Sequence, residues 1–315
     1  MASLGLLIAI ALACGPGAPL WVSQVSHRGP DEQNLVGVVH VDGKAVPVVA
    51  DDGTPIGPGL RGAYLLGADS NGRDLFVRIL YGGRTSLAVG LASAVLCTIL
   101  ALLLSIPAGY LGGATDALIS RLLDLIWSFP VYLLAVALAT SFALGGLDLG
   151  PLHISGSSLL IPIFVIAIVY IPYLARPIRS EVLALRQREF VEAAVAHGAS
   201  SRRVMSREIL PNVIPTTLVL FTLIVANNIL TEAALSYLGV GVSVLTPSWG
   251  NIIQQGSSTI VTAPWQTIAP GIAIMLTAIA LNVLGDGLRD ALDPRGVVRV
   301  RRGRVRRRQG TAEAE

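Results

Sequence analysis

The chain has 315 residues, of which 53% are hydrophobic and 14% charged, and its mean hydropathy is +0.67. A soluble domain usually carries about 25% charged residues, so this composition argues against a soluble globular enzyme. The small share of charge also argues against a disordered chain. The two cysteines, Cys14 and Cys97, lie in apolar stretches and suggest neither a disulfide framework nor a zinc site. We therefore expect a membrane protein.

Six stretches are long and apolar enough, or nearly so, to cross a bilayer, which takes about 20 residues. They are residues 3–22, 85–111, 125–144, 158–175, 213–238 and 267–284. Prolines interrupt several of them, which a helix bundle tolerates because neighbouring groups hydrogen-bond the freed carbonyls. The first stretch lacks a basic segment before it and five more spans follow, so we expect an uncleaved helix rather than a signal peptide.

The arginines predict the orientation of these spans. With both termini inside, the cytoplasmic segments are 112–124, 176–212 and the part after residue 286, and they hold one, seven and nine arginines. The later outer loops, 145–157 and 239–266, hold none. The first outer loop holds six basic residues, but it is about 60 residues long, where the positive-inside rule weakens. We therefore expect both termini to be cytoplasmic.

The long outer loop contains a turn signal. Short β-rich runs flank Asp42 and Gly43 within residues 36–50, which predicts a small β-hairpin outside the membrane. His27 and His40 lie in the same loop, and nothing beside them completes a metal site.

The sequence lacks the motifs of an energy-coupling enzyme. Lys44 is the only lysine and Ala45 follows it, so there is no Walker A site and the chain is not a P-loop ATPase. A membrane hydrolase would need a nucleophile next to a general base, and the sequence offers no such nucleophile–base pair. The polar groups expected inside the spans are Glu232, Asn227, Asn228 and Asn282. A stand-alone secondary transporter would usually show more ionisable groups or two related halves.

Residues 176–212 form the most informative loop. The spacing of apolar and charged residues predicts an amphipathic helix over 180–197, which Gly198 ends. Ser200 or Ser201 can cap a second, basic helix. We expect Pro211 to separate this helix from the fifth span. The loop thus predicts a helix–turn–helix that offers small residues to a partner. An ordinary charged loop at the membrane surface is the alternative.

The run Glu192-Ala193-Ala194, with Gly198 and Ile209-Leu210-Pro211 after it, resembles the Glu-Ala-Ala loop of bacterial ATP-binding cassette (ABC) importer permeases. Motifs within residues 65–295 also resemble those of the second permease subunit in the dipeptide, oligopeptide and nickel class of these importers. By this resemblance, the residues that couple to the ATPase are Glu189, Glu192, Ala193, Ala194, Gly198, Ala199, Arg202, Arg203, Leu210 and Pro211. The family signature is carried by Gly67, Asp69, Gly72, Arg73, Asp74, Arg84, Asp116, Asp124, Gly285, Asp286, Arg289 and Asp290.

Two features depart from the family. Ala68 stands where threonine is usual, and the segment before Gly67 is longer than usual, with the expected hairpin filling it. This insertion limits what the resemblance implies about how a substrate-binding protein docks.

The resemblance implies an all-α polytopic membrane protein with six transmembrane helices, the type I ABC importer permease (MetI-like) fold. The expected parts are a first transmembrane helix over 1–22 and an extracytoplasmic loop with the hairpin over 23–84. A core of five helices follows over 85–286 with the coupling loop 176–212, and a basic cytoplasmic tail ends the chain over 287–315. The arginine-rich part of the tail, 299–308, could bind anionic lipid or remain a solvated end.

The implied function is that of a non-catalytic permease subunit in the cytoplasmic membrane. With a second homologous permease it would form the pathway for di- and oligopeptides. Two ATPase subunits would bind ATP and Mg²⁺, and an extracytoplasmic binding protein would deliver the solute. We expect no metal, cofactor or nucleic acid to be bound by this chain. Nickel or another small solute remains an alternative cargo, and a stand-alone secondary transporter is the more distant alternative.

Overall fold

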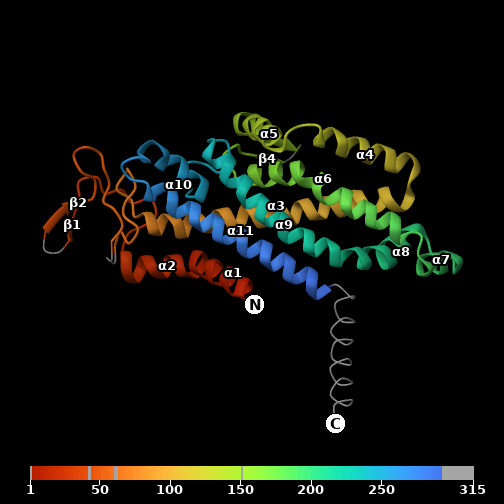
Figure 1. The fold of residues 1–315 in the computed structure, drawn as a ribbon. Coiled ribbons are helices and arrows are strands. Elements are labelled where there is room, and N and C mark those ends of the chain that lie inside the picture. Colours follow the sequence, from red (N-terminus) through yellow and green to blue (C-terminus); the bar gives the residue numbers. More distant parts are fainter. Residues whose placement is uncertain (1, 42–43, 60–62, 150–151, 293–315) are drawn as a thin grey trace, which may run out of the picture.

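The computed structural model describes residues 2–41, 44–59, 63–149 and 152–292. Figure 1 shows an elongated molecule whose long helices run along its length, with strands β1 and β2 at one end and helices α7 and α8 at the other. Within the described part, five helices are long and apolar enough to cross a membrane, and a bent pair could supply a sixth. The expected polytopic helical fold is therefore confirmed.

The first two spans are longer than the apolar stretches suggest. The first is a helical run, Ser3–Ser26, in which α1 (Ala2–Leu12) and α2 (Ala18–Trp21) are joined and extended by π-helical turns. The second is α3 (Leu75–Leu111), which begins ten residues before the expected start at position 85. The first outer loop is correspondingly shorter than 23–84. The early start follows from Asp74, whose carboxylate caps the helix.

The third span is not the single helix expected over 125–144. Instead α4 (Gly113–Trp127) and α5 (Val131–Gly145) meet at 90°. Much of the expected cytoplasmic loop 112–124 is thus helical. The break has a local cause, because a residue before proline avoids helical backbone angles, and Phe129 precedes Pro130, the residue that flanks the start of α5.

The loop 176–212 also differs from expectation. Helix α6 (Leu160–Leu185) runs well past residue 175, and α7 (Glu189–Ala196) is a separate short helix, so the single helix predicted over 180–197 is wrong. After α7, α8 (Ser201–Val204), a π-helical turn and α9 (Leu210–Tyr237) form one continuous run. Pro211 therefore lies inside this helical run and does not interrupt it, contrary to expectation.

The remaining elements are short or follow the expected last span. Helices α10 (Trp249–Gly256) and α11 (Trp265–Leu292) come after α9, with a 3₁₀ turn at Ser257–Thr259 between them. Strands β1 (Val38–Val41) and β2 (Lys44–Pro47) pair antiparallel, which confirms the hairpin; its turn residues, Asp42 and Gly43, lie outside the described residues. A second hairpin, β3 (Leu147–Leu149) with β4 (Leu152–Ile154), was not expected. Most of the basic tail lies outside the described residues.

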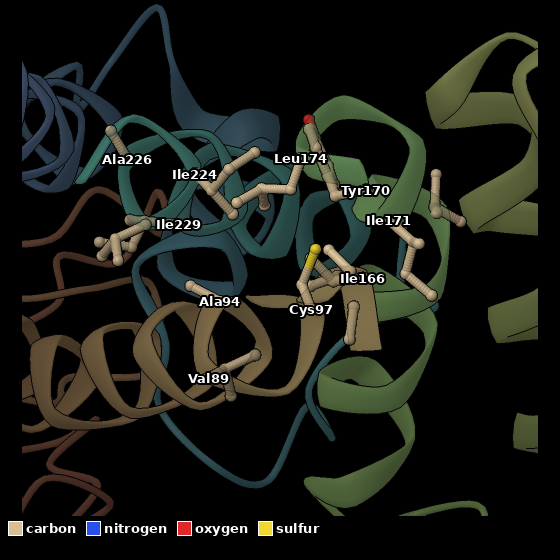
Figure 2. Packing of buried hydrophobic residues seen from close by; sticks show 14 of the residues in the cluster. Val89, Ala94, Cys97, Ile166, Tyr170, Ile171, Leu174, Ile224, Ala226 and Ile229 are labelled. Atoms are coloured by element: carbon tan, nitrogen blue, oxygen red, sulfur yellow. The ribbon is translucent and has the colours of Figure 1, made fainter. Parts of the chain in front are cut away.

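The core lies where α3 packs against α6 and α9. Figure 2 shows Val89, Ala94 and Cys97 of α3 among residues of α6 such as Ile166 and of α9 such as Ile229. These side chains are buried although the helices are apolar nearly all round. In a bilayer the apolar surface of a helix is not itself the driving force for packing, so close side-chain contact selects the buried face.

Candidate functional site

The residues expected to couple to an ATPase gather at the α7 end of the molecule (Figure 1). Helix α7 has one buried side chain, Val191, which is 2% exposed and fixes the helix to the bundle. Glu189, Glu192 and Ala193 are exposed, and Ala194 is half-buried. The helix therefore presents its acidic and small residues outward and uses a single apolar anchor.

Gly198 ends α7 in a Schellman motif. The Gly198 N–H donates to the Val195 carbonyl at 2.9 Å, and the Ala199 N–H donates to the Ala194 carbonyl at 3.0 Å. The φ of Gly198 is +78°, a left-handed angle that residues with a Cβ rarely adopt. The motif turns the chain sharply from α7 into α8.

The segment after this turn is anchored by Val204 and Ile209, which are fully buried. Four expected coupling residues surround these anchors: Arg202, Arg203 and Pro211 are exposed and Leu210 is half-buried. A cavity of about 560 Å³ separates the end of α3 from α7, lined by residues that include Tyr110, Leu111, Arg186, Val191, Glu192 and Val195. The α7 end thus combines exposed charge with an open groove.

The signature residues of the outer loop lie at the opposite end. Asp69 binds Arg73 Nε at 2.7 Å, and Arg78 Nε lies 3.6 Å from the same carboxylate. Both guanidinium groups also donate to Gln255 Oε1 of α10, at 2.7 and 3.2 Å. Arg78 further contacts Asp31 at 3.2 Å. This buried network joins the loop, α3 and α10.

Asp74 organises the start of α3. One carboxylate oxygen accepts the Phe76 and Val77 N–H groups at 3.0 and 3.2 Å, a helix cap. The other accepts Tyr64 N–H at 2.9 Å and Ser26 Oγ–H at 3.1 Å. Asp74 therefore ties the first span and the outer loop to α3. Tyr64 has a φ of +59°, and burial raises the pKa of its hydroxyl.

Two signature glycines set the backbone conformation of this loop. Gly72 has a φ of +73°, and its N–H donates to the Asp69 backbone carbonyl at 2.9 Å, which forms a tight turn inside the network. Gly67 accepts the Leu75 N–H at 3.1 Å. Arg84, also in the expected signature, is exposed and lies over the Tyr81 ring at 5.5 Å.

The two signature aspartates of α4 bind arginines of α6. Asp116 pairs with Arg179 through two hydrogen bonds of 2.5 Å. Asp124 pairs with Arg176 at 2.7 Å, and the Arg176 guanidinium lies 4.4 Å from the centre of the Trp127 ring. These pairs hold α4 alongside α6.

The last signature residues lie on α11. Gly285 is buried, and a Cβ there would clash with Thr222 of α9, so this position lets the two helices approach closely. Asp286, Arg289 and Asp290 are exposed near the end of the helix. The structure thus separates the expected signature into three places rather than one site.

Sequence reasoning missed Arg78, Arg176 and Arg179 as partners of the signature aspartates, and Gln255 as the partner of Arg73 and Arg78. The Asp69–Arg73 spacing of four residues gave a signal for local pairing, but Gln255 is 177 residues from Arg78 and gave none. Among the described residues, no group of three or more His, Cys, Asp or Glu side chains could hold a metal ion.

Residues 101–297 match the family model of the binding-protein-dependent transport system inner membrane component. The chain belongs to this family, so it is a multi-pass permease component of an inner-membrane import system. It is 42% identical over 238 residues to a putative peptide transport system permease of Brucella suis, which covers 76% of this chain and 75% of the relative.

Other relatives carry related names. The oligopeptide transport system permease protein OppC of Haemophilus influenzae is 36% identical, covering 76% of this chain and 72% of the relative. The glutathione transport system permease protein GsiD of Pectobacterium atrosepticum is 39% identical, covering 74% and 73%.

A solved structure shares the fold. The inward-facing MetNI methionine ABC transporter gives a TM-score of 0.54 at 17% identity, covering 68% of this chain and 96% of that chain. The MetI-like fold expected from the sequence is therefore confirmed.

Proposed function

We propose that this chain is one of two permease subunits of an ABC importer for short peptides, and that α7 couples it to ATPase subunits. The names of the relatives support the peptide cargo. The observation that carries the coupling role is α7 itself: a helix whose one buried side chain is Val191, with Glu192 and Ala193 exposed.

The geometry supports transmission of force through this helix. The Schellman turn at Gly198 fixes the angle between α7 and α8, and α8 continues without a break into α9. A push on α7 therefore reaches a membrane-length helix directly. The small Ala193 and Ala194 allow a partner surface to approach closely. The orientation that fits puts α7 and both termini in the cytoplasm and β1–β2 outside, where a binding protein delivers the peptide.

The test is a charge placed on the contact surface. In Ala193→Asp, the exposed new carboxylate leaves the fold intact but disrupts a closely packed contact, so we expect the ATPase subunits to be lost when the complex is purified through this chain. Gly198→Asp should act in the same way by distorting the turn. Ser257→Asp, an exposed position at the opposite end, is the matched control and should retain the ATPase subunits.

Purification from membranes and peptide uptake by proteoliposomes give the two readouts. Retained ATPase subunits and normal uptake in both Ala193→Asp and Gly198→Asp would refute the coupling role. The amount of each variant in the membrane fraction shows whether it is inserted.

A further inference from the structure

One exposed helix face differs from the rest of the bundle. Helix α3 exposes Leu91, Val95, Ile99 and Leu103 at four-residue spacing, an aliphatic face that suits lipid or an apolar partner helix. After Leu160 at its start, the exposed positions of α6 are instead Tyr173, Pro177, Ser180 and Ala184. Their spacing puts them on one side of the helix, and the half-exposed Arg176 borders them. We call these five residues the α6 face.

The break between α4 and α5 lies beside this face. Trp127 and Phe129 are exposed at the break, and the Trp127 and Tyr173 ring centres are 4.4 Å apart. Irregular backbone at membrane depth persists only where protein buries it or where it lines a water-filled space. The residues between the two helices, 128–130, are exposed.

A cavity of about 270 Å³ lies at the same place. It is lined by residues of the break, including Trp127, Phe129 and Pro130, and by Val169 and Tyr173 of α6. This is slightly below the usual range of small-molecule pockets, about 300–1,000 Å³. The cavity therefore suits one or two residues of a chain rather than a whole large ligand.

Two opposite charges flank the cavity. The Arg176 and Asp124 side chains are 39% and 62% exposed although they bind each other at 2.7 Å. Charged side chains that are exposed to this degree contact water or protein rather than lipid. Lipid therefore does not cover the α6 face next to this pair.

We propose that the α6 face and the α4–α5 break form a binding stretch of the translocation passage for a zwitterionic short peptide. Arg176 binds the peptide's carboxylate, Asp124 binds its ammonium group, and the Trp127 and Tyr173 rings hold an apolar side chain. The ion pair offers the same two charges that a peptide carries at its ends, so a peptide replaces each partner with its equivalent. This inference rests on the proposed function.

Thiol labelling tests whether the face is wet and occupied. The chain's own Cys14 and Cys97 are buried, and buried thiols react slowly, so introduced cysteines report cleanly. Tyr173→Cys and Ser180→Cys are compared with Ile99→Cys, the matched control on the aliphatic face of α3. The full complex in proteoliposomes is treated with a charged methanethiosulfonate, with and without trialanine, and modification is read on this chain by mass spectrometry.

We expect Tyr173→Cys and Ser180→Cys to react at least about ten-fold faster than Ile99→Cys, since only accessible thiols ionise and react readily. Trialanine should slow the reaction of Ser180→Cys, a variant that keeps both rings and both charges of the proposed site. If Tyr173→Cys reacts as slowly as Ile99→Cys, a partner helix or lipid covers the face and the proposal is wrong. Fast reaction without protection by trialanine means a wet surface that does not bind peptide, which also refutes it.

Uptake of trialanine and of its carboxy-terminal amide gives a second test. In the Arg176→Gln variant, the ratio of trialanine uptake to uptake of the amide should fall about ten-fold from its wild-type value, because a charge-assisted hydrogen bond to the carboxylate is lost. Arg28→Gln, a half-exposed position paired with Glu32 at the β1–β2 end, should keep the preference. A wild-type complex that imports no peptide refutes the proposed function. A wild-type complex that imports trialanine, with unchanged discrimination in Arg176→Gln, refutes only this inference.

Discussion

At the β1–β2 end, the Asp69 and Arg78 side chains are 6% and 1% exposed, whereas at the α7 end Asp116 and Arg179 are 23% and 28% exposed. The first pair shares further hydrogen bonds with Arg73 and Gln255. Within the part of the chain that the structure describes, the second pair shares a hydrogen bond with one other side chain, Ser120. The same kinds of residue thus form two different structures. The buried cluster of Asp69, Arg73, Arg78 and Gln255 is fixed, and we call it the platform. The partly exposed Asp116–Arg179 pair can open, and we call it the joint.

The difference follows from the cost of leaving a charge alone. A buried charge that loses its partner has no water to replace it, and the loss is about 3–5 kcal/mol. A partly exposed pair costs less to open, because water solvates each charge when the pair opens; fully exposed pairs are worth about 0–1 kcal/mol. The platform therefore keeps its shape, while the joint can open and close at small cost.

The largest effect is expected at the platform. Asp69→Ala removes the carboxylate that two buried guanidinium groups share, so the free energy of unfolding should fall by about 3–5 kcal/mol. Denaturant titration of the detergent-solubilised protein measures it, with the buried Trp249 among its fluorescent reporters. Asp52→Ala, at an exposed turn of the same loop, is the control and should leave the midpoint unchanged. Equal midpoints for the two variants would contradict the platform.

A smaller and local effect is expected in α7. Val191→Ala removes two methyl groups from the helix's single anchor, so docking of α7 should weaken by about 1–2 kcal/mol. Limited proteolysis should cut within residues 186–200 more readily, while global unfolding stays the same. Val195→Ala, an exposed position on the same helix, should resist proteolysis like the wild type. Equal cutting of both variants would show that Val191 is not the anchor.

The smallest effect is expected at the joint. Asp116→Asn removes the ion pair with Arg179, and the free energy of unfolding should fall by at most about 1 kcal/mol. About 1 M salt should remove even this difference, since it screens exposed charges. Denaturant titration at low and high salt measures both. A loss as large as that of Asp69→Ala would remove the distinction between the two ends.

Local patterns predicted what local forces decide. The alternating run around residues 42–43 predicted the β1–β2 hairpin, and apolar stretches predicted the spanning helices. The helix start at Asp74 was missed although the residue was singled out, because a capping carboxylate was not considered within the outer loop. The three-residue strands β3 and β4 were too short to give a pattern.

Tertiary contacts decided the rest. No glycine or proline marks the end of α6 at Leu185, so the break before α7 could not be read from residues 180–197. The burial of Val191 against the bundle sets the direction of α7 instead. The residues that the motif suggested for coupling lie together at the α7 end, and their coupling role stays a prediction. The partner of Asp116, Arg179, comes from the distant helix α6 and needed the structure.

The length of α3 has a mechanical consequence. Its 37 residues span about 55 Å, nearly twice the hydrocarbon thickness of about 30 Å. One end is clamped at Asp74 and the other reaches the groove beneath α7. A rigid helix that tilts about one end moves most at the other: a tilt of about 5° about Asp74 displaces the far end by roughly 5 Å. A displacement of about one helical turn next to α7 thus requires only a slight tilt of α3 at its Asp74 end.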